Sequence, residues 1–172
     1  MIMTMPVFPI PIISYPLPIE AVSQFRWVFF GMFANECGAV IREKSRARLA
    51  EYGISDPDGD DTDCEDGHGW GVRVMSNGGA FWYPASQPRY TLTIEENAFS
   101  GTFSAEAAGI VMTLLTLHHV ASVARKDGAD HDAEHLDTQQ FRLREYVVQH
   151  PEASKIDAAI AHPVWQTEID DE

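Results

Sequence analysis

The chain has 172 residues and a mass of 19.2 kDa, the size of one domain, and its 45% hydrophobic content is enough to form a buried core. Disorder along the whole chain is therefore excluded. The formal net charge is −14, from 12 basic and 26 acidic residues. This balance argues against direct nucleic-acid binding, because phosphate recognition needs a basic face.

The first 18 residues are rich in proline and read as an extended arm, because proline fixes φ and holds the preceding residue in extended geometry. Its apolar side chains indicate that it packs on this domain or on another chain. The prolines and the lack of a basic start exclude a secretory signal. We expect no membrane span, since no run of about 18 apolar residues is present. The two cysteines, Cys37 and Cys64, fit a reducing cytoplasm.

Two helices are predicted next, over 19–33 and over 36–52, the second ending where Gly53 can serve as a helix cap. Residues 54–69 then read as an acidic loop with almost nothing to bury. Residues 56–66 hold seven acids, the tail 164–172 holds four more, and without these eleven the net charge is −3. The acids of the loop are Asp56, Asp58, Asp60, Asp61, Asp63, Glu65 and Asp66.

This acidic loop resembles a calcium site in composition only. The EF-hand pattern needs glycine at its sixth position, and Asp61 stands there when the count starts at Asp56. We interpret the loop mainly as a solvated insertion. Weak divalent-cation binding and electrostatic attraction of a partner are the alternatives, the second through Asp58, Asp60, Asp61, Asp63, Glu65 and Asp66.

The segments that are predicted to form β-strands follow the acidic loop. Strands are predicted over 71–75 and 80–83, joined by a tight turn at Asn77 and Gly78, and a third over 90–94. Helices are predicted over 104–125, 134–149 and 152–161, with Ser104 as the N-cap of the first and Glu106 in its first turn. The fold class is therefore α+β: a small antiparallel meander of about three strands packed against four or five helices, in one domain over 19–163.

Two histidine patterns are candidate sites. His131, Glu134 and His135 match H-x-x-E-H, in which two imidazoles on one helix face bind zinc and the carboxylate acts as base. The acidic, solvent-like context favours a polar helix start instead, and a zinc hydrolase is kept as an alternative. His118 and His119 close the predicted 104–125 helix, where histidine commonly satisfies free carbonyls. A partner contact is their alternative role.

Three blocks of sequence resemble the ArdB/KlcA antirestriction family. Residues 70–84 (WGVRVMSNGGAFWYP) are similar to its aromatic strand, its L-S-N-G-G turn and the strand that ends before proline. Residues 104–119 (SAEAAGIVMTLLTLHH) resemble its S-x-E-A-A-G-I helix with a terminal histidine pair. Residues 141–152 (FRLREYVVQHPE) resemble its Y-R-L-R-D-Y-x-x-Q-H-P-E helix end. The blocks occur in the same order and span over half of the chain.

The resemblance implies a small cytoplasmic α+β protein, carried by plasmids, phages and genomic islands, that protects incoming DNA from type I restriction–modification enzymes. It implies no catalytic residues and no cofactor. The expected partner is a type I enzyme or an associated host factor. Besides the zinc hydrolase, the alternative function is that of a non-catalytic interaction module that forms a homo-oligomer through its N-terminal arm. A near-neutral body cannot mimic the dense charge of DNA. We therefore expect a shaped surface on the 104–125 helix and its neighbours to supply specificity, while the acidic segments speed encounter.

Overall fold

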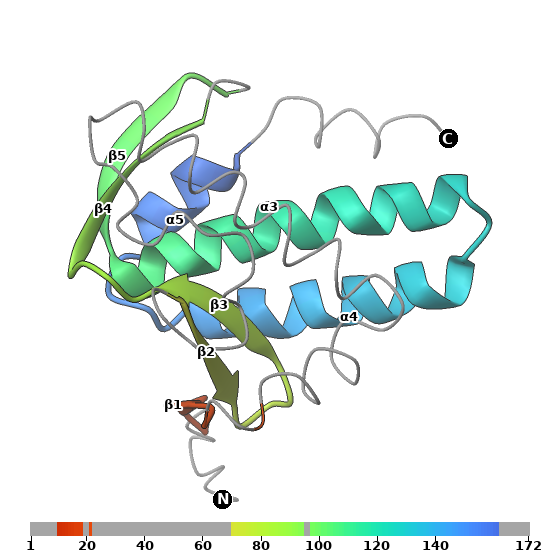
Figure 1. Cartoon of the computed structure of the whole chain (residues 1–172), viewed down its shortest axis with the longest axis horizontal. Helices are drawn as coiled ribbons and strands as arrows, with labels where there is room; N and C mark the ends of the chain where they lie inside the picture. The colour runs from red at the N-terminus through yellow and green to blue at the C-terminus, as the bar shows by residue number, and fades with distance from the viewer. Residues whose placement is uncertain (1–9, 19–20, 22–69, 95–96, 162–172) are drawn as a thin grey trace, which may run out of the picture.

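The computed structural model describes residues 10–18, 21, 70–94 and 97–161. Within these ranges the chain forms two small antiparallel sheets and three helices, which confirms the α+β class (Figure 1). Outside the described residues lie the helix predicted over 19–33, except for residue 21, the helix predicted over 36–52, the acidic loop 54–69 and the tail 164–172. The elements are β1 Ser14–Pro16, β2 Trp70–Met75, β3 Ala80–Pro84, β4 Arg89–Ile94, β5 Phe99–Ser104, α3 Ala105–Lys126, α4 Asp130–Val147 and α5 Ala153–Ile160.

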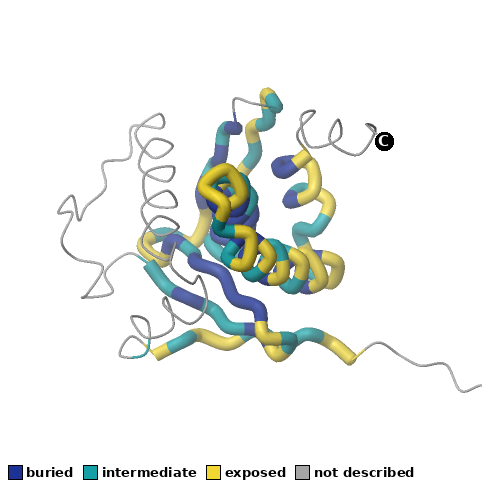
Figure 2. The backbone as a smooth tube through the Cα atoms, turned by 90° about the vertical axis from the view of Figure 1, so that its right-hand side faces the viewer, coloured by how far each residue is buried: buried dark blue, intermediate teal, exposed yellow. Residues whose placement is uncertain are grey.

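The predicted hairpin is confirmed as β2 and β3. Gly78 has φ +83°, a conformation that glycine adopts without strain, and the Asn77 Oδ1 accepts a hydrogen bond from the Gly79 N–H at 3.0 Å. The arm adds a third strand, because β1 pairs antiparallel with β2 and places Tyr15 opposite Val74. A three-residue strand among prolines gives no periodic signal, and β1 was not predicted. Figure 2 shows that β3 is buried while β1 lies at the surface.

The predicted three-strand meander is wrong in one respect, because β4 does not pair with β3. The edge of β3 that faces away from β2 is covered by α3. The Thr113 hydroxyl accepts a hydrogen bond from the Trp82 N–H at 3.1 Å and donates to the Trp82 carbonyl at 3.4 Å. A Cβ on Gly109 would lie 2.3 Å from that carbonyl oxygen, so only glycine allows this approach. The helix thus takes the place of a further strand.

Strand β4 instead pairs with β5, and the register places Leu92 opposite Gly101. Tyr90, Leu92 and Ile94 are buried, while the outward Thr91 hydroxyl bonds that of Thr102 at 2.9 Å. Strand β5 was not predicted, because its sequence FSGTFS has two apolar residues and a glycine and lacks β-branched apolar residues. The result is a second, two-stranded sheet that covers one end of α3 (Figure 1).

Helix α3 is the centre of the described core, and Leu114 and Leu117 are fully buried. By length and composition alone α3 would be able to cross a membrane. Because 72% of its most apolar 18-residue stretch is buried inside the protein, α3 also has the properties of the core helix of a folded domain. Gly128, with φ +74°, turns the chain back, and α4 packs alongside α3 (Figure 1). Helix α4 begins at Asp130, four residues before the predicted start.

Candidate functional site

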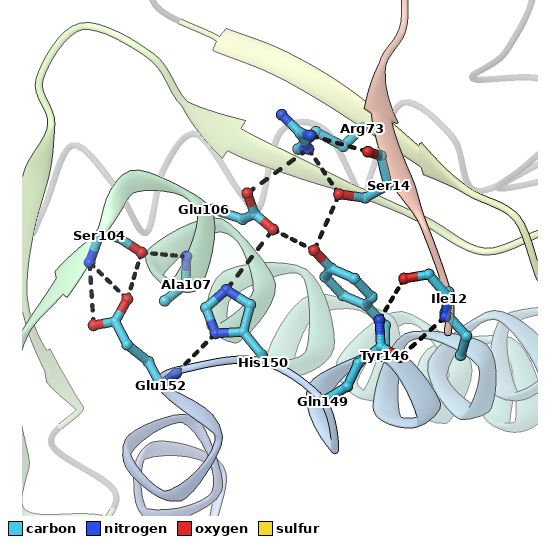
Figure 3. A network of polar contacts seen from close by, with 10 residues as sticks. All are labelled: Ile12, Ser14, Arg73, Ser104, Glu106, Ala107, Tyr146, Gln149, His150 and Glu152. Carbon is cyan, nitrogen blue, oxygen red and sulfur yellow. Dashed lines mark hydrogen bonds and ion pairs between the residues drawn. The ribbon is translucent and has the colours of Figure 1, made fainter. Parts of the chain in front are cut away.

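The described residues contain one extended network of polar side chains, centred on Glu106 in the first turn of α3 (Figure 3). The Tyr146 hydroxyl, on the last turn of α4, donates to Glu106 Oε1 at 2.6 Å. The Arg73 Nε, on β2, lies 3.8 Å from Glu106 Oε2. The His150 Nε2 lies 3.7 Å from Oε1, and the His150 side chain is only 7% exposed. One carboxylate therefore joins three segments that are far apart in the sequence.

The N-terminal arm enters this network through Ser14. Its Oγ lies 3.0 Å from the Tyr146 hydroxyl and accepts a hydrogen bond from Arg73 Nε at 3.1 Å, while Arg73 Nη2 donates to the Ser14 carbonyl at 3.1 Å. Arg73 thus holds both the side chain and the main chain of one residue of the arm. The arm packs on the body of its own domain, as Figure 3 shows.

A second carboxylate, Glu152, caps the start of α3 from the segment that follows α4. The Ser104 Oγ accepts a hydrogen bond from the Ala107 N–H at 3.2 Å, as predicted for an N-cap, and donates to Glu152 Oε2 at 2.5 Å. The Ser104 N–H also lies within 3.2 to 3.3 Å of both Glu152 oxygens. The Glu152 N–H donates to His150 Nδ1 at 3.1 Å. The imidazole proton is therefore on Nε2, facing Glu106.

These contacts shift the pKa of two groups. Burial raises the pKa of Tyr146 above its ordinary value of 10.0, and the hydrogen bond to the anionic Glu106 raises it further. Burial also acts to raise the pKa of Glu152, but the hydrogen bonds from Ser104 and the neighbouring Lys155 outweigh it. The pKa of Glu152 is therefore below its ordinary value of 4.5, and this carboxylate is charged at neutral pH.

The side chains of this network have a structural role, because their hydrogen bonds connect separate segments of the chain. The Ser14 hydroxyl contacts a phenol and a guanidinium, and the Ser104 hydroxyl already caps a helix. Neither hydroxyl is paired with an imidazole that would act as its general base. The side chains of the network instead tie β1, β2, the first turn of α3 and the segment after α4 to one another.

Those sequence-predicted site residues that the structure describes do not take part in this network. His118 is half-buried and His119 exposed on α3, and His131 and Glu134 are exposed and His135 half-buried on α4. Over the described ranges no group of three or more His, Cys, Asp or Glu side chains is placed to hold a metal ion. Asp58, Asp60, Asp61, Asp63, Glu65 and Asp66 lie outside the described residues.

The sequence did not predict that the residues around Glu106 form a network, although it placed Ser104 at the N-cap of a helix and Glu106 in the first turn of that helix. Each of the three blocks that resemble the ArdB/KlcA family contributes to the network: Arg73 from the first, Ser104 and Glu106 from the second, Tyr146 and His150 from the third.

Comparisons with known proteins place the chain in a family. A family model described as "Antirestriction protein" matches residues 65–161. An Escherichia coli antirestriction protein KlcA is 38% identical over 100 residues, covering 56% of this chain and 68% of that protein. A second E. coli KlcA is 33% identical over 99 residues and is covered over 66% of its length. The matched segment thus spans about two thirds of these relatives.

A solved structure extends the likeness to the fold. It is described as showing that KlcA and ArdB have a novel fold and antirestriction activity against type I DNA restriction systems in vivo but not in vitro. It superposes with a TM-score of 0.69 at 26% identity, over 91% of this chain and 100% of that one. The protein is thus an α+β protein of the KlcA/ArdB fold. The chain belongs to the antirestriction protein family, which confirms the resemblance found in its sequence.

Proposed function

We propose that this protein protects incoming mobile-element DNA by inhibiting type I restriction–modification systems in the cytoplasm. The observation that carries the proposal is the superposition on a KlcA/ArdB structure whose description names that activity. The network around Glu106 supports it, because it uses side chains from all three blocks that resemble the family.

The mode of action that we propose is contact with a protein, without catalysis. Its support is the use of the network's hydroxyls in structural hydrogen bonds and the near balance of charge outside the two acidic segments. A protein of this kind recognises its partner by surface shape, and the clustered acids of 56–66 raise the rate of encounter with a basic DNA-binding enzyme. Steering of this kind weakens with salt, since the screening length is about 8 Å at physiological ionic strength.

The partner in this proposal is either the restriction enzyme or a host factor associated with it. The solved relative is described as active in vivo but not in vitro, so an experiment is needed to distinguish these two partners. Capture of the tagged full chain from restricting cells, followed by identification of the bound proteins, separates the two. If the tagged chain also binds purified restriction subunits with no other protein present, the partner is the enzyme. If it recovers them only from whole-cell extract, the partner is a host factor.

The proposal is tested by the transformation efficiency of unmodified plasmid DNA in cells that carry a type I system, with and without expression of the full chain. We expect higher efficiency with the protein and no change for DNA already methylated by the same system, which is the matched control. Equal efficiencies against several type I systems would remove the proposal. Deletion of 56–66 is expected to weaken the effect only in part, because the segment contributes to encounter and the remaining surface to specificity.

A further inference from the structure

The exposed large apolar side chains of the described residues occur in two segments only. They are Ile10, Ile13 and Tyr15 in and beside β1, and Phe141 and Val148 on or next to α4. The two segments are joined, because both Gln149 amide atoms bond the main chain of Ile12. The arm thus lies at the Val148 end of α4. Exposed apolar residues confined to two segments that touch one another point to an interaction surface rather than to scattered exposure.

The outer face of α4 carries a further pattern. Phe141, Arg144, Glu145 and Val148 are all exposed, and their spacing of three, four and seven residues places them on one side of the helix. We call these four residues the α4 face. Phe141 is 63% exposed and Val148 83% exposed, values more typical of lysine or glutamate than of large apolar side chains.

The α4 face is complementary to itself. When two copies of the helix run antiparallel about a two-fold axis between positions 144 and 145, Phe141 of each copy lies opposite Val148 of the other. Arg144 of each copy lies opposite Glu145 of the other. Isologous interfaces require this kind of reciprocal matching, in which residue i contacts j and j contacts i. We propose that the α4 face is a self-association surface that pairs with the same face of a second copy of this chain.

The charges favour a second copy over an unrelated apolar partner. Within the described ranges the Arg144 guanidinium makes no hydrogen bond or ion pair, and the Glu145 carboxylate accepts only one bond, from Asn77 Nδ2 at 3.2 Å. Two reciprocal Arg–Glu pairs beside two apolar contacts would satisfy both charges without placing like charges together. One helix face per copy is a small interface, so the dimer should be weak and concentration-dependent. The inference goes beyond the proposed function and does not depend on it.

The test uses charge reversal in the full chain, followed by sedimentation over a range of concentrations up to about 1 mM, where small interfaces associate. Each of the single variants Arg144→Glu and Glu145→Arg places like charges opposite one another twice. We expect each to weaken dimerisation at least about tenfold. The double variant Arg144→Glu/Glu145→Arg exchanges the charges and should restore the dimer. An equimolar mixture of the two single variants should form a heterodimer, although each variant alone dimerises more weakly than the wild type.

The matched control is Asp157→Arg, a charge reversal at an exposed position of α5, which should leave dimerisation unchanged. Thermal unfolding followed by circular dichroism verifies that each variant folds, since Glu145→Arg also removes the bond from Asn77. A wild-type chain that stays monomeric throughout the range overturns the proposal. So does a dimer that the single reversals do not weaken, or a mixture of the single variants that remains monomeric. These outcomes concern association alone and leave the antirestriction assay unaffected.

Discussion

The side-chain amide of Gln149 bonds both main-chain groups of Ile12, its Oε1 accepting from the Ile12 N–H at 3.0 Å and its Nε2 donating to the Ile12 carbonyl. The Gln149 side chain thus accepts one main-chain hydrogen bond and donates another, as a neighbouring strand would in a sheet. With the bond from the Ile13 N–H to Ser76 Oγ at 3.0 Å, it holds the arm mainly through its backbone. The Ile12 side chain also packs against the core, whereas Ile13 is exposed, so docking of the arm depends little on the Ile13 side chain.

Replacing Gln149 by alanine should loosen the arm without unfolding the domain. The two lost hydrogen bonds are exposed, so the local opening free energy at Ile12 should fall by about 1 kcal/mol. Hydrogen exchange of the Ile12 and Ile13 amides measures the change, and amides of α3 serve as the internal reference. The variant Gln149→Glu keeps the acceptor and loses the donor, and should show a smaller increase. Unchanged exchange in Gln149→Ala would contradict this account of docking.

The hydrogen bonds between Ser104 and Glu152 predict that the stability of the protein depends on pH in a specific way. Ser104→Ala removes the N-cap of α3 and the hydroxyl donor to Glu152, at an expected cost of about 1 to 2 kcal/mol in the free energy of unfolding at pH 7. The pKa of Glu152 is below 4.5 in the folded chain, so its stabilisation is present above that pH and is lost as the pH falls through the folded pKa.

The difference in stability between wild type and Ser104→Ala should therefore narrow on acidification below pH 4.5. Urea denaturation at a series of pH values measures it. The control is Ser122→Ala, which removes a serine hydroxyl bonded only to the His118 carbonyl within α3, and which should change stability by less than about 0.5 kcal/mol. A constant difference between wild type and Ser104→Ala from pH 7 to pH 3 would mean that Glu152 does not act through Ser104.

There is a physical reason why some features could be predicted from the sequence and others could not. The β2–β3 hairpin and the Ser104 cap were predictable because each depends on residues within a few positions of one another: Asn77 with Gly79, and Ser104 with Ala107. The same holds for α3, whose sequence is apolar enough to predict a helix on composition and spacing. Such features depend on local geometry and need no knowledge of the tertiary contacts.

The network around Glu106 could not be predicted in the same way. The sequence placed Glu106 in the first turn of a helix, where its charge favours the helix dipole, but its partners come from positions 73, 146 and 150. Which residues meet depends on the pairing of α3 with α4. The pairing of β4 with β5 was missed for a related reason, because Gly109 and Thr113 of α3 occupy the edge of β3 that a meander would have used.

Tyr146 should ionise above the ordinary tyrosine pKa of 10.0 on alkaline titration. Burial and the bond to Glu106 raise its pKa above 10.0, so the unfolded chain loses this proton first and stability falls as the pH rises above 10.0. Glu106→Gln removes the anionic acceptor and should lower the pKa of Tyr146. Absorbance at the phenolate band, with Tyr146→Phe to identify its share, measures the shift. Phenylalanine keeps the ring stacked on Phe81, whose centroid lies 6.0 Å away. Identical titrations of wild type and Glu106→Gln would contradict the assigned bond.

The close approach of α3 to β3 gives the most severe expected destabilisation. In Gly109→Ala the new Cβ would lie 2.3 Å from the Trp82 carbonyl oxygen and 2.6 Å from the Tyr83 Cα, both backbone atoms of a buried strand. Because the backbone cannot yield as a flexible side chain does, we expect a loss of about 3 kcal/mol or more. Gly128→Ala is the matched control: its Cβ meets nothing within 4 Å, but its φ of +74° is left-handed, so the expected cost is about 1 to 2 kcal/mol. Urea denaturation compares the two, and an equal or smaller loss in Gly109→Ala would show that α3 can move away from β3.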